Sequence, residues 1–237
     1  MAHPWHHAVS SARRFGGAPS DFLRVHEWFD QSKAVTAHVK HRALRHHLEG
    51  VGRCVAVHAP QTGTCRLGDD TNVTVEAIGR QHLAEDFTGF VPRLVDWAAH
   101  MDVAALPLVA HRAEHRLQAP SAYADRLDTR LGTHDAAIFQ PLVEQMFCGL
   151  DPDDPRTWLV SLHAEGIFQA EWLLGPLLAA QIPVRIAAEA LVKTICGGTI
   201  PSANDWLAAL QVVPWMNRAR KLSLELGTSG APEHIPG

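Results

Sequence analysis

Most of the features that assign a function directly are scarce or absent in this sequence of 237 residues. The four cysteines form no Cys-x-x-Cys pair, so we expect free buried thiols rather than disulfides. No run approaches the roughly 18 apolar residues that cross a bilayer. The first residues also lack the basic start and apolar centre of a signal peptide. We therefore expect a cytoplasmic protein with no membrane-spanning segment.

Motifs of common enzyme classes are also missing from the sequence. There is no Gly-x-Ser-x-Gly nucleophile turn and no glycine-rich loop that would hold nucleotide phosphates. The formal net charge of −4 gives the whole chain no attraction for nucleic acid or anionic membranes. A hydrophobic content of 46% is enough to build a core, and the length allows one large domain or two small ones.

Histidine is the residue type that the sequence does concentrate. Thirteen of its sixteen histidines lie in the first 115 residues, and the densest stretch runs from His38 to Gly50. No glycine or proline interrupts residues 21–49, so the pattern predicts a helix from about residue 21 to Gly50. On that helix His47 joins the apolar face, while a polar arc would face a cleft, a partner or water. The arc consists of His38, His41, Arg42, Arg45, His46 and Glu49.

The remaining pattern of the first half is also mainly helical. Alternation at residues 71–75, after a stretch rich in Gly, Thr, Asp and Asn, predicts a small β-hairpin near residues 62–75. A helix should follow from about Glu76 and place His82 and Asp86, four residues apart, on one face. The expected fold class is therefore mainly α.

An internal repeat predicts how the helices are organised. Residues 45–60 align without gaps on residues 161–176, and residues 91–97 match residues 200–206. We therefore predict two tandem related helical units, residues 1–107 and 108–237. Residues kept in both copies are expected to serve the shared fold. They are His47, Glu49, Gly50, Pro60, Pro92, Asp96 and Trp97, which recur as His163, Glu165, Gly166, Pro176, Pro201, Asp205 and Trp206.

The second copy lacks the polar residues of the first. Thr157 stands in place of His41 and Leu162 in place of His46. The Gln-His and Glu-Asp pairs of residues 81–86 are replaced by Ala190, Leu191, Thr194 and Ile195. We infer that any chemistry belongs to the first unit. The second unit would then be a degenerate repeat with a structural or interface role.

Six motifs follow one another through the first half: His7-Ala8, Arg14-Phe15-Gly16-Gly17, Asp21-Phe22, His-Glu-Trp-Phe-Asp at residues 26–30, His-Arg-Ala-Leu-Arg-His-His-Leu-Glu-Gly at 41–50, and Gln-His-Leu-Ala-Glu-Asp at 81–86. In this order they resemble an uncharacterised bacterial and phage domain family over about residues 5–100. The resemblance implies no activity. It implies that six histidines are signature positions, namely His7, His26, His41, His46, His47 and His82.

Imidazoles and a carboxylate together are the ligands that zinc, manganese and iron prefer. The candidate ligands are His41, His46, His47, His82 and Asp86, with zinc as the favoured ion and manganese or iron as alternatives. A metal with an open position would activate water for hydrolysis of a phosphorylated or amide substrate. Arg42 and Arg45 are the candidate residues for holding its anionic group.

Other interpretations of the same residues stay open at this stage. The polar groups can form a hydrogen-bonded network between two helices, with His47 as a core histidine. Alternatively, they belong to a non-enzymatic, phage-related binding module with a protein or small-molecule partner or a homodimer contact. Nucleic-acid binding through the basic residues 33–53 is disfavoured by the acidic total. A zinc tetrad of Cys54, His58, Cys65 and His82 is the least favoured, because its cysteines are unpaired in sequence.

Overall fold

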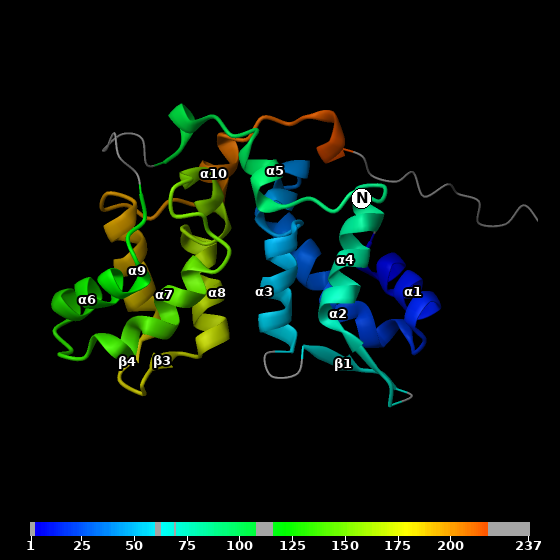
Figure 1. Ribbon diagram of the computed structural model, residues 1–237, viewed down its shortest axis with the longest axis horizontal. Helices are drawn as coiled ribbons and strands as arrows, with labels where there is room; N and C mark the ends of the chain where they lie inside the picture. Colours follow the sequence, from blue (N-terminus) through cyan, green and yellow to red (C-terminus); the bar gives the residue numbers. More distant parts are fainter. Residues whose placement is uncertain (1–2, 60–62, 69, 108–115, 218–237) are drawn as a thin grey trace, which may run out of the picture.

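A computed structural model describes residues 3–59, 63–68, 70–107 and 116–217 of the chain. It is mainly helical with small antiparallel strand pairs, which confirms the predicted fold class. Figure 1 shows two groups of helices side by side, one from the first half of the chain and one from the second. Among the described residues, every helix is too short or too polar to cross a membrane.

The first part begins with two helices, α1 (Pro4–Phe15) and α2 (Pro19–Asp30), followed by the short 3₁₀ helices η1 (Gln31–Ala34) and η2 (Val39–Leu44). Helix α3 (Leu48–His58) precedes the predicted hairpin, whose strands β1 (Thr64–Arg66) and β2 (Asn72–Thr74) pair Cys65 with Val73. The part ends with α4 (Val75–Asp86), α5 (Leu94–Ala98) and η3 (Val103–Ala105).

The second part has a similar order of elements. It contains α6 (Pro120–Leu131), η4 (Ala136–Phe139), α7 (Gln140–Phe147), η5 (Pro155–Val160), α8 (Ala164–Leu174), β3 (Leu177–Leu178), β4 (Ile182–Pro183), α9 (Val184–Ile195), α10 (Ala203–Ala208) and η6 (Pro214–Asn217). Elements η5 and α8 have the same lengths as η2 and α3 and lie 116 positions later, and α9 has the same length as α4 and lies 109 positions later.

The predicted continuous helix from residue 21 to Gly50 is wrong. Helix α2 ends at Asp30, and α3 begins only after His47, whose backbone is extended at φ −153°. The His47 Nδ1 accepts a hydrogen bond of 3.0 Å from the Gly50 N–H, so the imidazole is the N-cap of α3. Local capping thus outweighs the helical periodicity. The predicted polar arc is lost as well, because the resulting turn buries His41, Arg42 and His46.

The second part repeats this cap. The His163 Nδ1 accepts a hydrogen bond of 3.1 Å from the Gly166 N–H, and its backbone is extended at φ −155°. The indole of Trp206 donates to the Leu162 carbonyl at 2.9 Å, just as Trp97 donates to the His46 carbonyl at 3.2 Å. Residues that the two halves share therefore make the same local contacts.

The two parts meet through matched backbone contacts. Met101 and Leu210 form an antiparallel bridge. On its two sides the Asp102 N–H donates to the Ala209 carbonyl and the Gln211 N–H donates to the His100 carbonyl, both at 2.9 Å. Since each bond is the counterpart of the other, the two parts are related locally by an approximate two-fold axis. One cluster of buried apolar side chains extends through both parts.

Trp215, near the end of the described chain, packs against aromatic residues of the first part. Its ring lies 4.7 Å from that of Trp97 and 5.8 Å from that of Phe87, measured between centroids. We expect Trp215→Ala to lower the free energy of unfolding by about 2 kcal/mol, since aromatic contacts and burial are both lost. Urea denaturation checks this, with Trp172→Ala as the control, because Trp172 is 59% exposed. Equal losses in the two variants would contradict the role of Trp215.

Candidate metal centre

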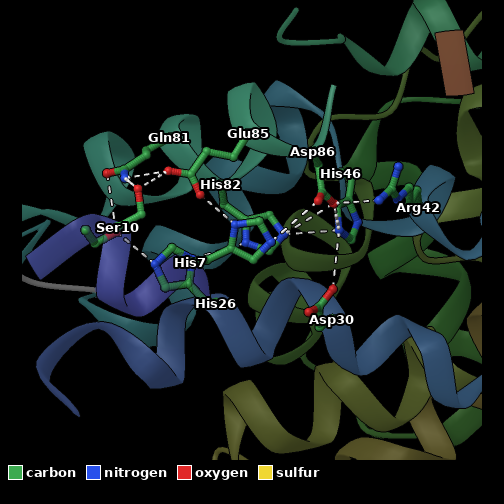
Figure 2. A network of polar contacts seen from close by, with 11 residues as sticks. His7, Ser10, His26, Asp30, Arg42, His46, Gln81, His82, Glu85 and Asp86 are labelled. Carbon is green, nitrogen blue, oxygen red and sulfur yellow. Dashed lines mark hydrogen bonds and ion pairs between the residues drawn. The ribbon is translucent and has the colours of Figure 1, made fainter. Parts of the chain in front are cut away.

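A buried cluster of imidazoles and carboxylates lies where α1, α2, α4 and the turn before α3 converge. Figure 2 shows these side chains pointing toward one another from four segments of the first part. The members with exposures of 7% or less are His7, His26, Asp30, His41, Arg42, His46, His82 and Asp86. Each segment is short and ends near the cluster, so packing of the helices brings the polar groups together.

Four donor atoms converge at the centre of this cluster. The His46 Nε2 lies 3.2 Å from the His82 Nε2, 3.4 Å from the Asp86 Oδ2 and 3.8 Å from the Asp30 Oδ1. The His82 Nε2 lies 3.8 Å from the Asp86 Oδ2. A tetrahedral metal ion with bonds of about 2.1 Å separates neighbouring ligand atoms by about 3.4 Å. The separations among the His46 Nε2, the His82 Nε2 and the Asp86 Oδ2 therefore match the edges of a metal coordination shell, and the Asp30 Oδ1 lies at a similar distance from His46.

A second group of donors shares two of these residues. His7, His82 and Asp86 each offer one atom within 4.8 Å of the others, as do Asp30, His46 and His82. The His7 Nε2 lies 3.5 Å from the Asp86 Oδ1, so the two oxygens of Asp86 face different groups. Histidine and acidic groups that could hold a metal ion are thus present in the first part of the structure.

A second carboxylate, that of Glu85, lies on the other side of the His7 ring. Its Nδ1 lies 2.7 Å from the Glu85 Oε2, and Glu85 accepts further hydrogen bonds from Ser10 and Gln81. Burial alone would lower the pKa of His7. The hydrogen bonds and charges of Asp86 and Glu85 outweigh burial and raise the pKa to about 9.

Three further imidazoles are held neutral by burial. Burial lowers the pKa of His26 and of His41 to about 3, and it lowers the pKa of His82 well below the ordinary value. Neutral imidazole is the form that binds a metal. Burial would raise the pKa of Asp86, but hydrogen bonds from His46 and His7 keep it well below its usual range. The cluster therefore presents the neutral imidazole of His82 beside the ionised carboxylate of Asp86.

Buried polar atoms remain unsatisfied inside the cluster. The Asp30 Oδ2 and the His46 Nδ1 are buried and have no hydrogen-bond partner among the described residues. Unpaired buried polar atoms cost about 1–3 kcal/mol each. An ion held by the His46 Nε2 and by Asp30 would offset the cost at the carboxylate, whereas the His46 Nδ1 would face away from that ion.

The structure places the predicted ligands unequally. It brings His46, His82 and Asp86 together, whereas His41 lies beside them and its Nδ1 is 2.8 Å from the Ser32 hydroxyl. His47 points to its own helix terminus, where it caps α3. The ligand roles predicted for His41 and His47 stay predictions without support from the donor geometry.

Sequence reasoning omitted His7 and Asp30 from the ligand set. The only local signal for Asp30 was its spacing of four residues from His26, and His7 was noted only through the family resemblance. His26 contacts His82 on the ring nitrogen that faces away from His46. The His26 Nδ1 lies 3.1 Å from the His82 Nδ1, and the His26 Nε2 lies 2.9 Å from the Ser11 hydroxyl. Neither donor group contains a cysteine, so the tetrad with Cys54 and Cys65 gains no support.

The two predicted anion-binding arginines are engaged within the protein. Arg42 is 1% exposed, and its Nη2 lies 3.1 Å from the Asp86 Oδ2 while its Nη1 donates to the Met216 carbonyl at 3.4 Å. Arg45 donates to the Trp28 carbonyl, and its guanidinium carbon lies 4.7 Å from the centre of the Trp28 ring. Arg42 thus orients a candidate ligand. A role of either arginine in binding substrate stays a prediction.

Comparison with known proteins adds the extent of the family resemblance. Residues 2–106 match the family described as a domain of unknown function, DUF6915. This match contains every residue of the cluster and ends before the second part. No curated protein and no solved structure matches the chain.

Proposed function

We propose that the first part of the chain is a metal-binding domain that holds a divalent transition metal, zinc in preference to manganese or iron. The observation that carries the proposal is the convergence of donor atoms on the His46 Nε2, which lies 3.2–3.8 Å from the His82 Nε2, the Asp86 Oδ2 and the Asp30 Oδ1. Nitrogen and oxygen donors without thiolate suit all three metals, and a set of four such donors favours tetrahedral zinc.

Burial supports a structural rather than a freely exchanging ion. The four donors are exposed by 7% or less, and closed coordination shells are typical of structural zinc sites. Such an ion would tie α2 and α4 to the turn before α3. Arg42 would then neutralise part of the negative charge of Asp86.

A metal-free network is the competing interpretation. Its favourable evidence is charge balance, because Asp30 pairs with Lys33 at 2.7 Å, Asp86 with Arg42 at 3.1 Å and Glu85 with His7 at 2.7 Å. In that case the histidines would link the helices by hydrogen bonds alone. The two interpretations differ in metal content, which can be measured directly.

Metal analysis of the purified full chain tests the proposal. We expect about one equivalent of metal in the parent, and about a tenth of that or less in His82→Ala and in Asp30→Asn, because each variant removes one donor. Asp30→Asn keeps the shape of the side chain, so loss of metal there is not a consequence of a cavity. His58→Ala is the control, since it removes a histidine outside the cluster.

The outcomes separate the two interpretations. A parent that neither contains metal nor binds added zinc would overturn the metal proposal and leave the hydrogen-bonded network. Metal binding that survives in both donor variants would place the ion elsewhere. Removal of a structural ion by a chelator should also lower the melting temperature of the parent, whereas it should leave the melting temperatures of the donor variants unchanged.

Hydrolysis is a second candidate function, favoured by one cavity. A cavity of about 510 Å³ lined by Ser10, Arg14, Gln81, Ala84, Glu85, Thr88 and Gly89 lies next to the cluster, and Glu85 joins it to His7. Arg14 is suited to bind a phosphate there. Hydrolysis of p-nitrophenyl phosphate by the zinc-loaded chain, lost in Arg14→Ala, would support this reaction. Equal rates with and without added zinc would exclude it.

A further inference from the structure

A buried arginine joins the two parts away from the candidate metal centre. Arg53 of α3 is 6% exposed and extends into the second part. Its Nε and Nη2 donate to the Cys148 carbonyl at 3.2 and 3.0 Å, and its Nη1 donates to the Val160 carbonyl at 2.9 Å. Two backbone carbonyls of the second part thus form a slot that a guanidinium fills.

The counterpart of this slot lacks its arginine. Gln169 of α8 stands 116 positions after Arg53, and the same shift relates the Cys148 and Val160 carbonyls to those of Ser32 and Leu44. Ser32, Leu44 and Gln169 all line one cavity of about 410 Å³ between η1, η2 and α8. Glutamine is shorter than arginine and carries no charge, so this half of the approximate two-fold arrangement remains unfilled.

The cavity wall carries groups for both ends of a guanidino acid. Glu165, whose side chain is 41% exposed, lines it with a carboxylate, and Phe168 is 71% exposed and can contact a guanidinium face. Arg45 also lines it. The guanidinium of Arg45 therefore suits a carboxylate.

We infer that this cavity is a binding site for a small guanidino carboxylic acid of the arginine type. The guanidinium would take the place that Arg53 takes in the other slot, with the Ser32 and Leu44 carbonyls and Glu165 as acceptors. The carboxylate would contact Arg45. The volume falls within the usual range of small-molecule sites.

Calorimetric titration of the full chain with free arginine tests the inference. We expect saturable binding with a Kd of about 1 mM or lower. Citrulline, which has the same shape without the charge, should bind at least about tenfold more weakly. Agmatine, which lacks the carboxylate, should also bind more weakly than arginine. Citrulline binding as tightly as arginine would overturn the inference, and so would the absence of arginine binding.

Two variants locate the binding site. Gln169→Arg should fill the slot with the chain's own guanidinium, and Ala34→Trp should block the exposed rim on η1, so each should abolish arginine binding. Should one variant fail to fold, the other decides. Arginine binding unchanged in a folded variant would place the ligand elsewhere and overturn the inference. Metal content is expected to stay at the parental value in both variants, which keeps this test separate from that of the metal proposal.

Discussion

Gly50→Ala is expected to lower the free energy of unfolding by about 3 kcal/mol or more, one of the largest effects of any single methyl group in this chain. A Cβ at this position would overlap the Arg45 carbonyl oxygen and lie 2.8 Å from the carbonyl carbon. The backbone cannot yield easily, because that oxygen accepts a hydrogen bond of 3.0 Å from the His47 N–H. The turn that carries His46 into the cluster would have to move.

Gly52→Ala is the matched control for this prediction. Gly52 lies two residues further along α3, and a Cβ there would meet no atom within 4 Å. Because alanine is the better helix former, we expect Gly52→Ala to stabilise the protein by about 0.5–1 kcal/mol. Urea denaturation of both variants provides the comparison. A Gly50→Ala variant as stable as the parent would show that the turn is not a rigid part of the fold.

Gly166→Ala, the equivalent substitution in the second part, should lower the free energy of unfolding in the same way. A Cβ on Gly166 would overlap the Ser161 carbonyl oxygen and lie 2.6 Å from its carbon. The His-x-Glu-Gly sequence therefore recurs for a physical reason, since histidine caps the helix and glycine lets the preceding turn approach. Comparison of the two halves of the sequence predicted that these residues serve the fold. Their common geometry supports the proposed tandem duplication.

The hairpin and the helix carrying His82 were predictable because they depend on local pattern. Alternating residues gave the strands, and helical spacing placed His82 and Asp86 on one face of α4. The predicted long helix failed because periodicity cannot distinguish a helix from two shorter ones joined by a side-chain cap. His47 makes that cap, and its chemistry is visible only when the backbone of Gly50 is placed.

The candidate site was only partly predictable, because it depends on contacts between distant segments. His46 and His82 are 36 positions apart, and His7 is 78 positions from Glu85. A single sequence records the residue types but not which helices pack together. His41 and Asp30 illustrate this. Both are buried near His46, but it is Asp30 that places an oxygen beside the ligand nitrogens of His46 and His82.

Acid is expected to unfold the chelator-treated protein well above the pH at which carboxylates titrate. His26 and His41 have pKa values of about 3 in the fold, and the ordinary value is 6.5. The unfolded chain therefore binds these two protons more readily. Their stabilising effect is fully present above pH 6.5 and is lost as the pH falls from 6.5 toward 3. Each histidine contributes a slope of about 1.4 kcal/mol per pH unit.

The expected loss is comparable to the whole stability of a domain. Two such histidines remove roughly 5 kcal/mol between pH 6.5 and 4.5, and native domains are stable by about 5–15 kcal/mol in total. His7 acts in the opposite direction. Its pKa is raised to about 9, so its stabilising effect is present below pH 6.5 and is lost as the pH rises through 9. Stability should therefore be greatest near pH 6.5.

Urea denaturation at pH 8.5, 6.5, 5.5 and 4.5 in the presence of a chelator measures this profile. His41→Asn is the informative variant, because its amide N–H can still donate to the Ser32 hydroxyl, whose own proton goes to the Phe29 carbonyl, and the amide does not titrate. The acid slope of this variant should fall by about 1.4 kcal/mol per pH unit relative to the parent, which is the share of one histidine. A parent whose stability stays constant from pH 6.5 to 4.5 would show that these histidines are not held neutral in the fold. In the presence of zinc the parent should lose stability still more steeply in acid, because protons then compete with the ion for His82.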